Sequence, residues 1–340
     1  MFNVFDLQKK LVEAALPSGS EQKVGALLAE LARPFVDEVW TDALGSVICH
    51  KKGPGKRIMM PAHMDTIGFI ALYIEEEGFI RFDGIGGHTP ANLTGTPIRF
   101  ASGVRGTIRP AKLAELAAKP YNAIKMSDLY IDIGAKDKAE AEKLVRVGDV
   151  AVFDTVTQLV AGNNLMTPYA DDLIACVVLL LTMERLKDQK CENDLYFVFS
   201  VQEEVGLRGA TTAAFAIDPY MGIAVDVCST GDTPTSVDKM VVKVGAGPTV
   251  KIKDGSLICN PQVVQHLRAA ADAAGIAYQD EILVAGGTDS GAMQRTRGGV
   301  YSGCISIPTR HIHSPAEICN IGDVEQASVL LAAACTREVK

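Results

Sequence analysis

The sequence predicts an α/β fold, in which a mixed sheet covered by helices is interrupted by a small β-rich insert. Beyond residue 163, helical segments alternate with strands that are apolar throughout, such as 195–201 and 222–227. Strands of this kind are typical of sheets that helices cover on both faces. Between 78 and 153, by contrast, short β-like segments are separated by Gly and Pro, which indicates a small barrel or sandwich.

The first sixty residues are expected to form a helix followed by strands. Ser18-Gly-Ser-Glu21 fits a capping box in front of an amphipathic helix over 22–32. Short apolar runs at 47–49 and 57–60 are of strand type. The pattern changes after Gly68, where the insert begins.

Strand-type segments dominate the insert, and the chain then returns to alternating helices and strands. In the insert we expect strands at 79–82, 96–100, 104–108, 129–133 and 149–153, with short helices at 112–118 and 139–146. After it we expect helices at 173–186, 262–274 and 324–336. The predicted domains are therefore a main domain formed by 1–66 plus 160–340 and a β-rich insert formed by 67–159.

The composition excludes several classes of protein. With 340 residues, of which 48% are hydrophobic and 22% charged, the chain fits about two globular domains rather than a disordered, collagen-like or coiled-coil protein. Lys and Arg total 33 against 41 acidic residues, so the net charge is −8. An acidic chain without a basic run argues against nucleic acid or an anionic membrane as a partner.

Three further features of the sequence predict a cytoplasmic protein. The longest apolar run, near 173–183, is too short to cross a bilayer, and the first ten residues do not resemble a secretory signal. Eight cysteines are scattered without a CxxC pair. We interpret them as small buried hydrophobic residues in a reducing compartment.

Acidic and histidine clusters follow several predicted strands, which is where open α/β sheets form their sites. In His63-Met-Asp65, a carboxylate could hold the second ring nitrogen of a metal-binding histidine, although this motif alone is weak evidence. Asp171-Asp172 opens the helix at 173–186, so its simplest interpretation is a helix cap.

Three further clusters also have structural alternatives. Glu203-Glu204 could lie in a solvated loop, but paired charges at the end of a buried strand are costly unless they are used. Asp226 lies inside an apolar strand and could be a hydrogen-bonded polar residue of the core. His311 and His313 could be loop histidines.

Taken together, these clusters predict a metal site. Two imidazoles and three carboxylates can hold two divalent ions with one carboxylate shared between them, and the set is His63, Asp171, Glu204, Asp226 and His313. Nitrogen and oxygen ligands without thiolate suit zinc, cobalt or manganese. Glu203 is left over as a carboxylate that binds no metal, and it is the candidate general base.

Over essentially its whole length the chain resembles the tetrahedral (TET-type) metalloaminopeptidases, a group of glutamyl aminopeptidases and endoglucanase M-like proteins. The motifs that carry the resemblance occur in the family's order: Ala62-His-Met-Asp-Thr-Ile-Gly68, Asp171-Asp172, Gln202-Glu-Glu-Val-Gly206, Val225-Asp226 with Gly231-Asp-Thr-Pro234, Gly286-Gly-Thr-Asp-Ser290 and Ile307-Pro-Thr-Arg-His-Ile-His-Ser-Pro315. The resemblance implies a zinc-peptidase domain of the phosphorylase/hydrolase-like kind that removes N-terminal residues from peptides.

The resemblance also implies how the metal ligands are divided. Asp171 would bridge both metals. His63 and Asp226 would complete one metal site, and Glu204 and His313 would complete the other.

The remaining roles come from the same resemblance. Glu203 would be the catalytic base, and Asp65 would orient His63 from behind. The peptide bond between Asp171 and Asp172 is typically cis in this superfamily.

Two positions depart from the family pattern. Leu173 stands where the family usually has Arg, which removes a positive charge near the bridging carboxylate. His311 stands where the family usually has Tyr. If 311–313 is a strand, His311 and His313 point to the same face, so His311 is a rival ligand, although we favour His313.

The position of the insert distinguishes this family from its relatives. The interval from His63 to Asp171 is long enough for a complete small domain, whereas related carboxypeptidases and deacylases carry their extra domain later in the chain. In the TET-type family the early insert is a dimerisation domain, and dimers assemble into a tetrahedral dodecamer. The resemblance therefore implies a homo-oligomer that encloses its active sites.

Three alternatives remain open at this point. A related metal-dependent deacylase or carboxypeptidase would use the same ligands, and a non-catalytic assembly protein could share the fold. A glycosidase would need two carboxyl groups flanking a sugar but would leave the histidines without a role. The sequence does not reveal which N-terminal residue is preferred.

Overall fold

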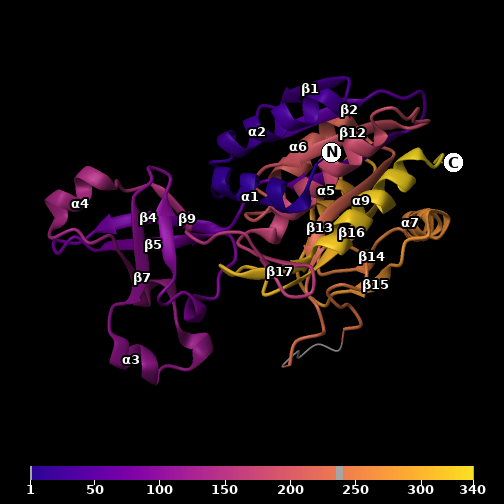
Figure 1. Ribbon diagram of the computed structural model, residues 1–340. Helices are drawn as coiled ribbons and strands as arrows, with labels where there is room; N and C mark the ends of the chain where they lie inside the picture. The colour runs from indigo at the N-terminus through magenta and orange to yellow at the C-terminus, as the bar shows by residue number, and fades with distance from the viewer. Residues whose placement is uncertain (1, 235–239, 340) are drawn as a thin grey trace.

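The computed structural model describes residues 2–234 and 240–339 and contains two bodies (Figure 1). One is an 11-stranded mixed sheet with helices on both faces, and the other is a closed barrel. The barrel lies to one side, and both chain ends lie on the body that holds the sheet. The predicted α/β fold with an inserted β-barrel is confirmed.

The centre of the large sheet consists of parallel neighbours, in the order β12 (Asp194–Ser200), β3 (Arg57–His63), β13 (Met221–Cys228) and β16 (Tyr301–Arg310). Antiparallel pairs extend it to both edges through β1 (Glu38–Thr41), β2 (Val47–Lys51), β17 (Glu317–Asn320), β11 (Asn164–Thr167) and β10 (Gln158–Val160). A side branch leaves β16 through β14 (Thr249–Lys253) and β15 (Gln279–Ile282). Because the central strands are parallel, their carboxyl ends meet at one edge, where α/β sheets bind ligands.

Successive residues of the central strands face two different sets of helices. On one face, Ile58 and Met60 of β3 belong to the core formed with α1 (Val4–Ala14), α2 (Gln22–Ala32), α5 (Ala170–Leu186), α7 (Pro261–Ala274) and α9 (Ile321–Thr336). On the other face, Met59 packs with residues of α6 (Arg208–Ile217) and α8 (Asp289–Gln294). Since both faces are covered, the strands are apolar at every position rather than at every second one.

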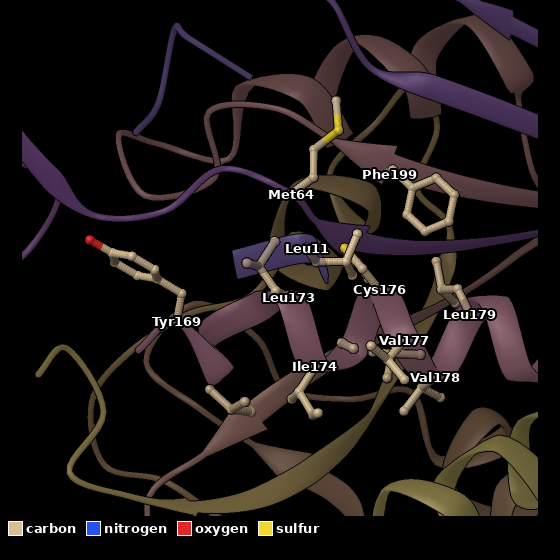
Figure 2. Packing of buried hydrophobic residues seen from close by; sticks show 14 of the residues in the cluster. Leu11, Met64, Tyr169, Leu173, Ile174, Cys176, Val177, Val178, Leu179 and Phe199 are labelled. Carbon is tan, nitrogen blue, oxygen red and sulfur yellow. The ribbon is translucent and has the colours of Figure 1, made fainter. Parts of the chain in front are cut away.

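Helix α5 is apolar on all sides and packs against α9, β3 and β13. Every residue from Ala170 to Met183 is buried. Figure 2 shows Leu173 and Ile174 on this helix, with Leu11 and Phe199 of the same core nearby. A helix that is hydrophobic all round is stable only when it is covered all round. Its first turn is therefore anchored in the core.

The barrel closes in the order β4, β5, β8, β7, β6, β9. Its strands are β4 (Gly68–Ile74), β5 (Ile80–Ile85), β6 (Pro97–Phe100), β7 (Arg105–Pro110), β8 (Leu129–Asp132) and β9 (Val150–Phe153). Ile98 and Phe100 are both fully buried because side chains two positions apart point to the same face of a strand. Short helices accompany it, namely α3 (Leu113–Ala118), α4 (Lys138–Leu144), and the 3-10 turns η2 (Pro90–Asn92), η3 (Tyr121–Ala123) and η4 (Met126–Asp128), while η1 (Arg33–Phe35) follows α2. The domain limits at 66/67 and 159/160 stay a prediction.

Two local expectations are wrong. Helix α2 begins as expected, but its N-cap is Glu21 and no side chain caps it, because the Ser18 hydroxyl donates to Asp65 instead. His311 and His313 do not lie in a strand, since β16 ends at Arg310 and both histidines have positive φ angles of 63° and 62°.

Among the described residues, none of the helices has both the length and the apolar character that a membrane span requires.

Candidate metal centre

The carboxyl ends of the central parallel strands supply most of the candidate residues. His63 is the last residue of β3, Asp226 lies near the end of β13, and Glu203 and Glu204 follow β12. His313 follows β16, and Asp171 comes from the first turn of α5. The structure brings these six side chains to one pocket of about 620 Å³.

The carboxylate of Asp171 lies between two histidines. Its Oδ1 atom is 3.0 Å from His63 Nε2, and its Oδ2 atom is 3.3 Å from His313 Nε2. His313 Nε2 is also 3.2 Å from Glu204 Oε2. The peptide bond that follows Asp171 is cis, as the resemblance implied. The two oxygens of Asp171 thus face the two halves of the predicted ligand set.

The donor atoms are close enough together to hold metal ions. In the described part of the chain, three groups have all their ligand atoms within 4.8 Å of one another: His63 with Asp171 and Glu204, His63 with Glu203 and Asp226, and Asp171 with Asp172 and Asp226. Glu204 Oε1 and Asp172 Oδ1 are buried without a hydrogen-bond partner. Such carboxylates are costly unless a cation compensates them, and imidazole with carboxylate suits zinc, cobalt or manganese. The residues present therefore fit divalent cations.

Burial dominates the electrostatics of the pocket. It raises the pKa of Glu203 and of Asp226 well above the usual range, and neighbouring carboxylates add to both shifts. Burial alone would lower the pKa of His313, but Asp171 and Glu204 outweigh it and raise that pKa to about 11. Burial acts on the pKa of Asp171 in the raising direction, yet the hydrogen bonds from His313 and His63 hold it below its ordinary value.

Asp65 lies behind the pocket and does not line it. Its carboxylate accepts hydrogen bonds from the main-chain N–H groups of Glu203 at 3.0 Å and Glu204 at 3.2 Å, and from the Ser18 hydroxyl at 2.7 Å. Its Oδ1 atom is 3.6 Å from His63 Nδ1, whose hydrogen bond of 3.0 Å goes to the main-chain carbonyl of Asp65. Asp65 is therefore connected to both the histidine and the glutamate pair.

The sequence analysis missed Glu317, at the start of β17. Glu317 is fully buried, and its carboxylate accepts hydrogen bonds from the main-chain N–H groups of Asp171 and His313, each at 2.9 Å. It also missed the role of Asp172, whose Oδ2 atom accepts a hydrogen bond from the His63 N–H at 3.1 Å. Glu317 carries no sequence signal that separates it from an ordinary acidic residue, whereas Asp172 belongs to the Asp171-Asp172 motif but was given no role of its own.

The two departures from the family pattern lie in different surroundings. Leu173 lies on α5, is fully buried in the core and does not line the pocket. His311 is exposed and is also absent from the pocket lining, whereas His313 lines it.

A loop of the barrel reaches the same centre. Gly86 and Gly87 follow β5, and a Cβ atom on Gly87 would come within 3.0 Å of the His313 ring. Gly86 has a φ of +77°, and a Cβ atom there would lie 3.2 Å from Glu204 Cβ. A side chain at Gly87 would thus crowd His313, and one at Gly86 would also strain the backbone, because its φ is positive.

Comparison with known proteins settles the family. Residues 45–330 match the model of the M42 glutamyl aminopeptidases. The chain belongs to this family. Among M42-like relatives, a protein of Acetivibrio thermocellus, provisionally named an aminopeptidase, is 44% identical over 331 residues and 97% of each chain. The lysyl aminopeptidase of Pyrococcus furiosus is 34% identical over 99% of this chain and 97% of its own.

A solved structure agrees with the M42 assignment. The TET1 peptidase of Pyrococcus horikoshii, described as assembling into a tetrahedron or a large octahedral shell, superposes with a TM-score of 0.87. It is 30% identical, and the alignment covers 99% of this chain and 100% of that one. The M42 family is one of aminopeptidases, and this member carries acidic and histidine groups that can bind metal.

Proposed function

We propose that this protein is a metal-dependent aminopeptidase with two divalent ions and a glutamate general base. The observation that carries the proposal is the position of Asp171, whose two carboxylate oxygens face His63 and His313 separately. A carboxylate so placed is suited to bridging two ions. Asp226 would complete the site on the His63 side, and Glu204 the site on the His313 side.

The protein's own residues would bind and orient the reactants. Divalent cations in such a site supply Lewis acidity and bring the pKa of a water molecule to about 7. Glu203 lines the pocket, and its Oε2 atom is 3.9 Å from His63 Nε2. Because burial raises its pKa, the Glu203 carboxylate is suited to accepting a proton from water and delivering it to the leaving amine.

We further propose a homo-oligomer of dimers arranged as a tetrahedral dodecamer, with the insert of residues 67–159 as the dimerisation domain. The named assembly of the Pyrococcus horikoshii TET1 peptidase supports it. So do exposed apolar side chains on and near the barrel strands, namely Leu72, Tyr73, Leu144 and Val147. In the described part of the chain the cysteines are unpaired and buried, which fits our prediction of a cytoplasmic enzyme.

The test is hydrolysis of aminoacyl-p-nitroanilides by chelator-treated protein to which zinc, cobalt or manganese is returned. We expect release that depends on the added metal and disappears when the substrate's amino group is acetylated. Cleavage of the acetylated substrates would indicate a deacylase or an endopeptidase instead. No release with any of the three metals, from a correctly folded oligomer, would favour the non-catalytic assembly protein.

A further inference from the structure

The lining of the pocket contains two chemically different groups of residues. One group is the six candidate site residues described above. The other consists of uncharged side chains and one lysine, among them Val227, Met240, Lys251, Ile282, Val284 and Ile312. If the first group holds the scissile bond, the second is available to receive a neighbouring side chain of the substrate.

Lys251 is the one lysine or arginine in the described lining, and its charge is already compensated. Its Nζ contacts Glu281 Oε1 directly and lies 3.5 Å from Asp254 Oδ2. The side chains of all three residues are at most 1% exposed. Thr249 donates a hydrogen bond to the second oxygen of Glu281, and Asp254 Oδ2 has no hydrogen-bond partner.

The sheet fixes this ion pair in place. Lys251 lies on β14 directly opposite Glu281 on β15, in the register of a parallel pair. Two buried carboxylates face one ammonium, so the cluster as a whole is not positive. An acidic side chain entering the pocket would therefore meet a cation that is already paired, with Glu281, Asp254 and Asp226 near it. A basic side chain would find no carboxylate of this cluster in the pocket lining, because neither Glu281 nor Asp254 belongs to it.

Two aliphatic residues of the lining are exposed. Ile282 and Val284 follow Glu281 along the chain, line the pocket, and are 56% and 73% exposed. Exposed aliphatic side chains in the lining of a pocket favour burial of another apolar group.

We propose that this pocket selects peptides whose N-terminal side chain is uncharged and apolar, and that the Lys251–Glu281 pair determines this selectivity by cancelling the lysine's charge. The proposal rests on the proposed aminopeptidase function, which it deepens by naming the substrate class. Lys251 here is a specificity residue that is neutralised, not a receptor for acidic side chains.

The first test is a panel of leucyl, methionyl, glutamyl and lysyl p-nitroanilides with the metal-loaded wild-type enzyme. We expect kcat/KM for the leucyl and methionyl substrates to exceed that for both charged ones by about tenfold or more. A wild-type preference for the glutamyl or the lysyl substrate would overturn the proposal.

Variants then test the ion pair. Glu281→Gln leaves Lys251 partly unpaired, so the glutamyl-to-leucyl ratio of kcat/KM should rise by about tenfold. The double variant Lys251→Met/Glu281→Leu removes both charges together and should keep the apolar preference. Asp280→Asn is the matched control, since Asp280 is the neighbour of Glu281 but forms an exposed pair with Arg268. An unchanged ratio in a folded Glu281→Gln protein would show that the pair does not determine selectivity.

A binding measurement separates this inference from the proposed function. Calorimetric titration of Glu203→Gln protein with Leu-Gly-Gly, Glu-Gly-Gly and Lys-Gly-Gly reports selectivity without turnover. Tighter binding of Leu-Gly-Gly supports the apolar selectivity of the pocket even if the wild-type protein hydrolyses nothing. In that case only the proposed function is wrong. Equal binding of the three peptides, together with normal hydrolysis, overturns the proposed selectivity of the pocket and leaves the proposed function intact.

Discussion

Glu317 Oε2 accepts a hydrogen bond of 2.9 Å from the main-chain N–H of Asp171, and Glu317 Oε1 accepts another from the N–H of His313. One buried carboxylate thus ties the first turn of α5 to the loop that follows β16. These segments carry Asp171 and His313, which we propose as metal ligands, so Glu317 links two groups of the proposed centre.

Glu317→Gln should weaken metal binding and turnover together. The amide nitrogen of Gln cannot accept a hydrogen bond, so one of the two N–H groups loses its partner. Changes to residues that support metal ligands cost about 10–100-fold in affinity or activity. Metal affinity can be measured by competition with a chelator, using the exposed Glu325→Gln as control. If both variants bind metal as the wild type does, Glu317 is only a core residue.

Glu203→Gln should abolish turnover and leave the metals bound. A general base contributes about 10²–10⁴-fold to the rate, and the proposed ligand set does not include Glu203. The measurement is kcat together with metal content by mass spectrometry. A rate close to that of the wild type would show that another group takes the proton.

His63→Ala and His313→Ala should each reduce the metal content of the purified protein. Each histidine contacts a different oxygen of Asp171, so each loss should affect a different ion. His311→Ala is the matched control, because His311 is exposed, outside the pocket lining and only two residues from His313. Metal loss in His311→Ala with none in His313→Ala would reverse the ligand assignment.

The ionised Asp232 carboxylate should stabilise the fold, and this contribution should be lost at low pH. The Arg310 guanidinium, together with hydrogen bonds from Thr230 and Val244, lowers its pKa from 3.8 to about 2. A carboxyl group whose pKa is lower in the folded state stabilises fully above its unfolded pKa, and the contribution disappears as the pH falls from about 4 to about 2. Asp232→Asn should therefore cost about 1 kcal/mol at pH 7 and nearly nothing at pH 2.

Urea unfolding at several pH values measures this difference, with the exposed ion-pair variant Asp280→Asn as control. A destabilisation of Asp232→Asn that is the same at pH 7 and pH 2 would contradict the assignment to ionisation.

The fold could be predicted because its signals are local. Strands covered on both faces must be apolar at every position, and the predicted strands 195–201 and 222–227 correspond to β12 and β13. Helix α5 could be predicted for the same reason, because it is covered on all sides and its sequence is almost continuously apolar. Elements without such patterns, such as α6, α8 and the side branch formed by β14 and β15, did not stand out.

Only part of the candidate site could be predicted from the sequence. Carboxylates and histidines that follow apolar strands stand out, and the structure brings six of them into one pocket. Glu317 did not stand out, because its contacts are to backbone groups of distant residues. The pairing of Lys251 with Glu281 depends on the register of two strands far apart in the chain, which no local pattern encodes. The backbone of His311 and His313 was misjudged because positive φ angles are rare outside glycine.

The contact between Gly87 and His313 has a consequence for the history and engineering of this chain. The barrel looks separable in Figure 1, yet its loop packs directly against a proposed ligand. A transplanted or shortened barrel would have to place glycine backbone at the position of Gly87. Otherwise the contact with the His313 ring would be lost. The insert and its host are thus expected to change in step, and we expect excision of the barrel to remove the backbone that contacts His313.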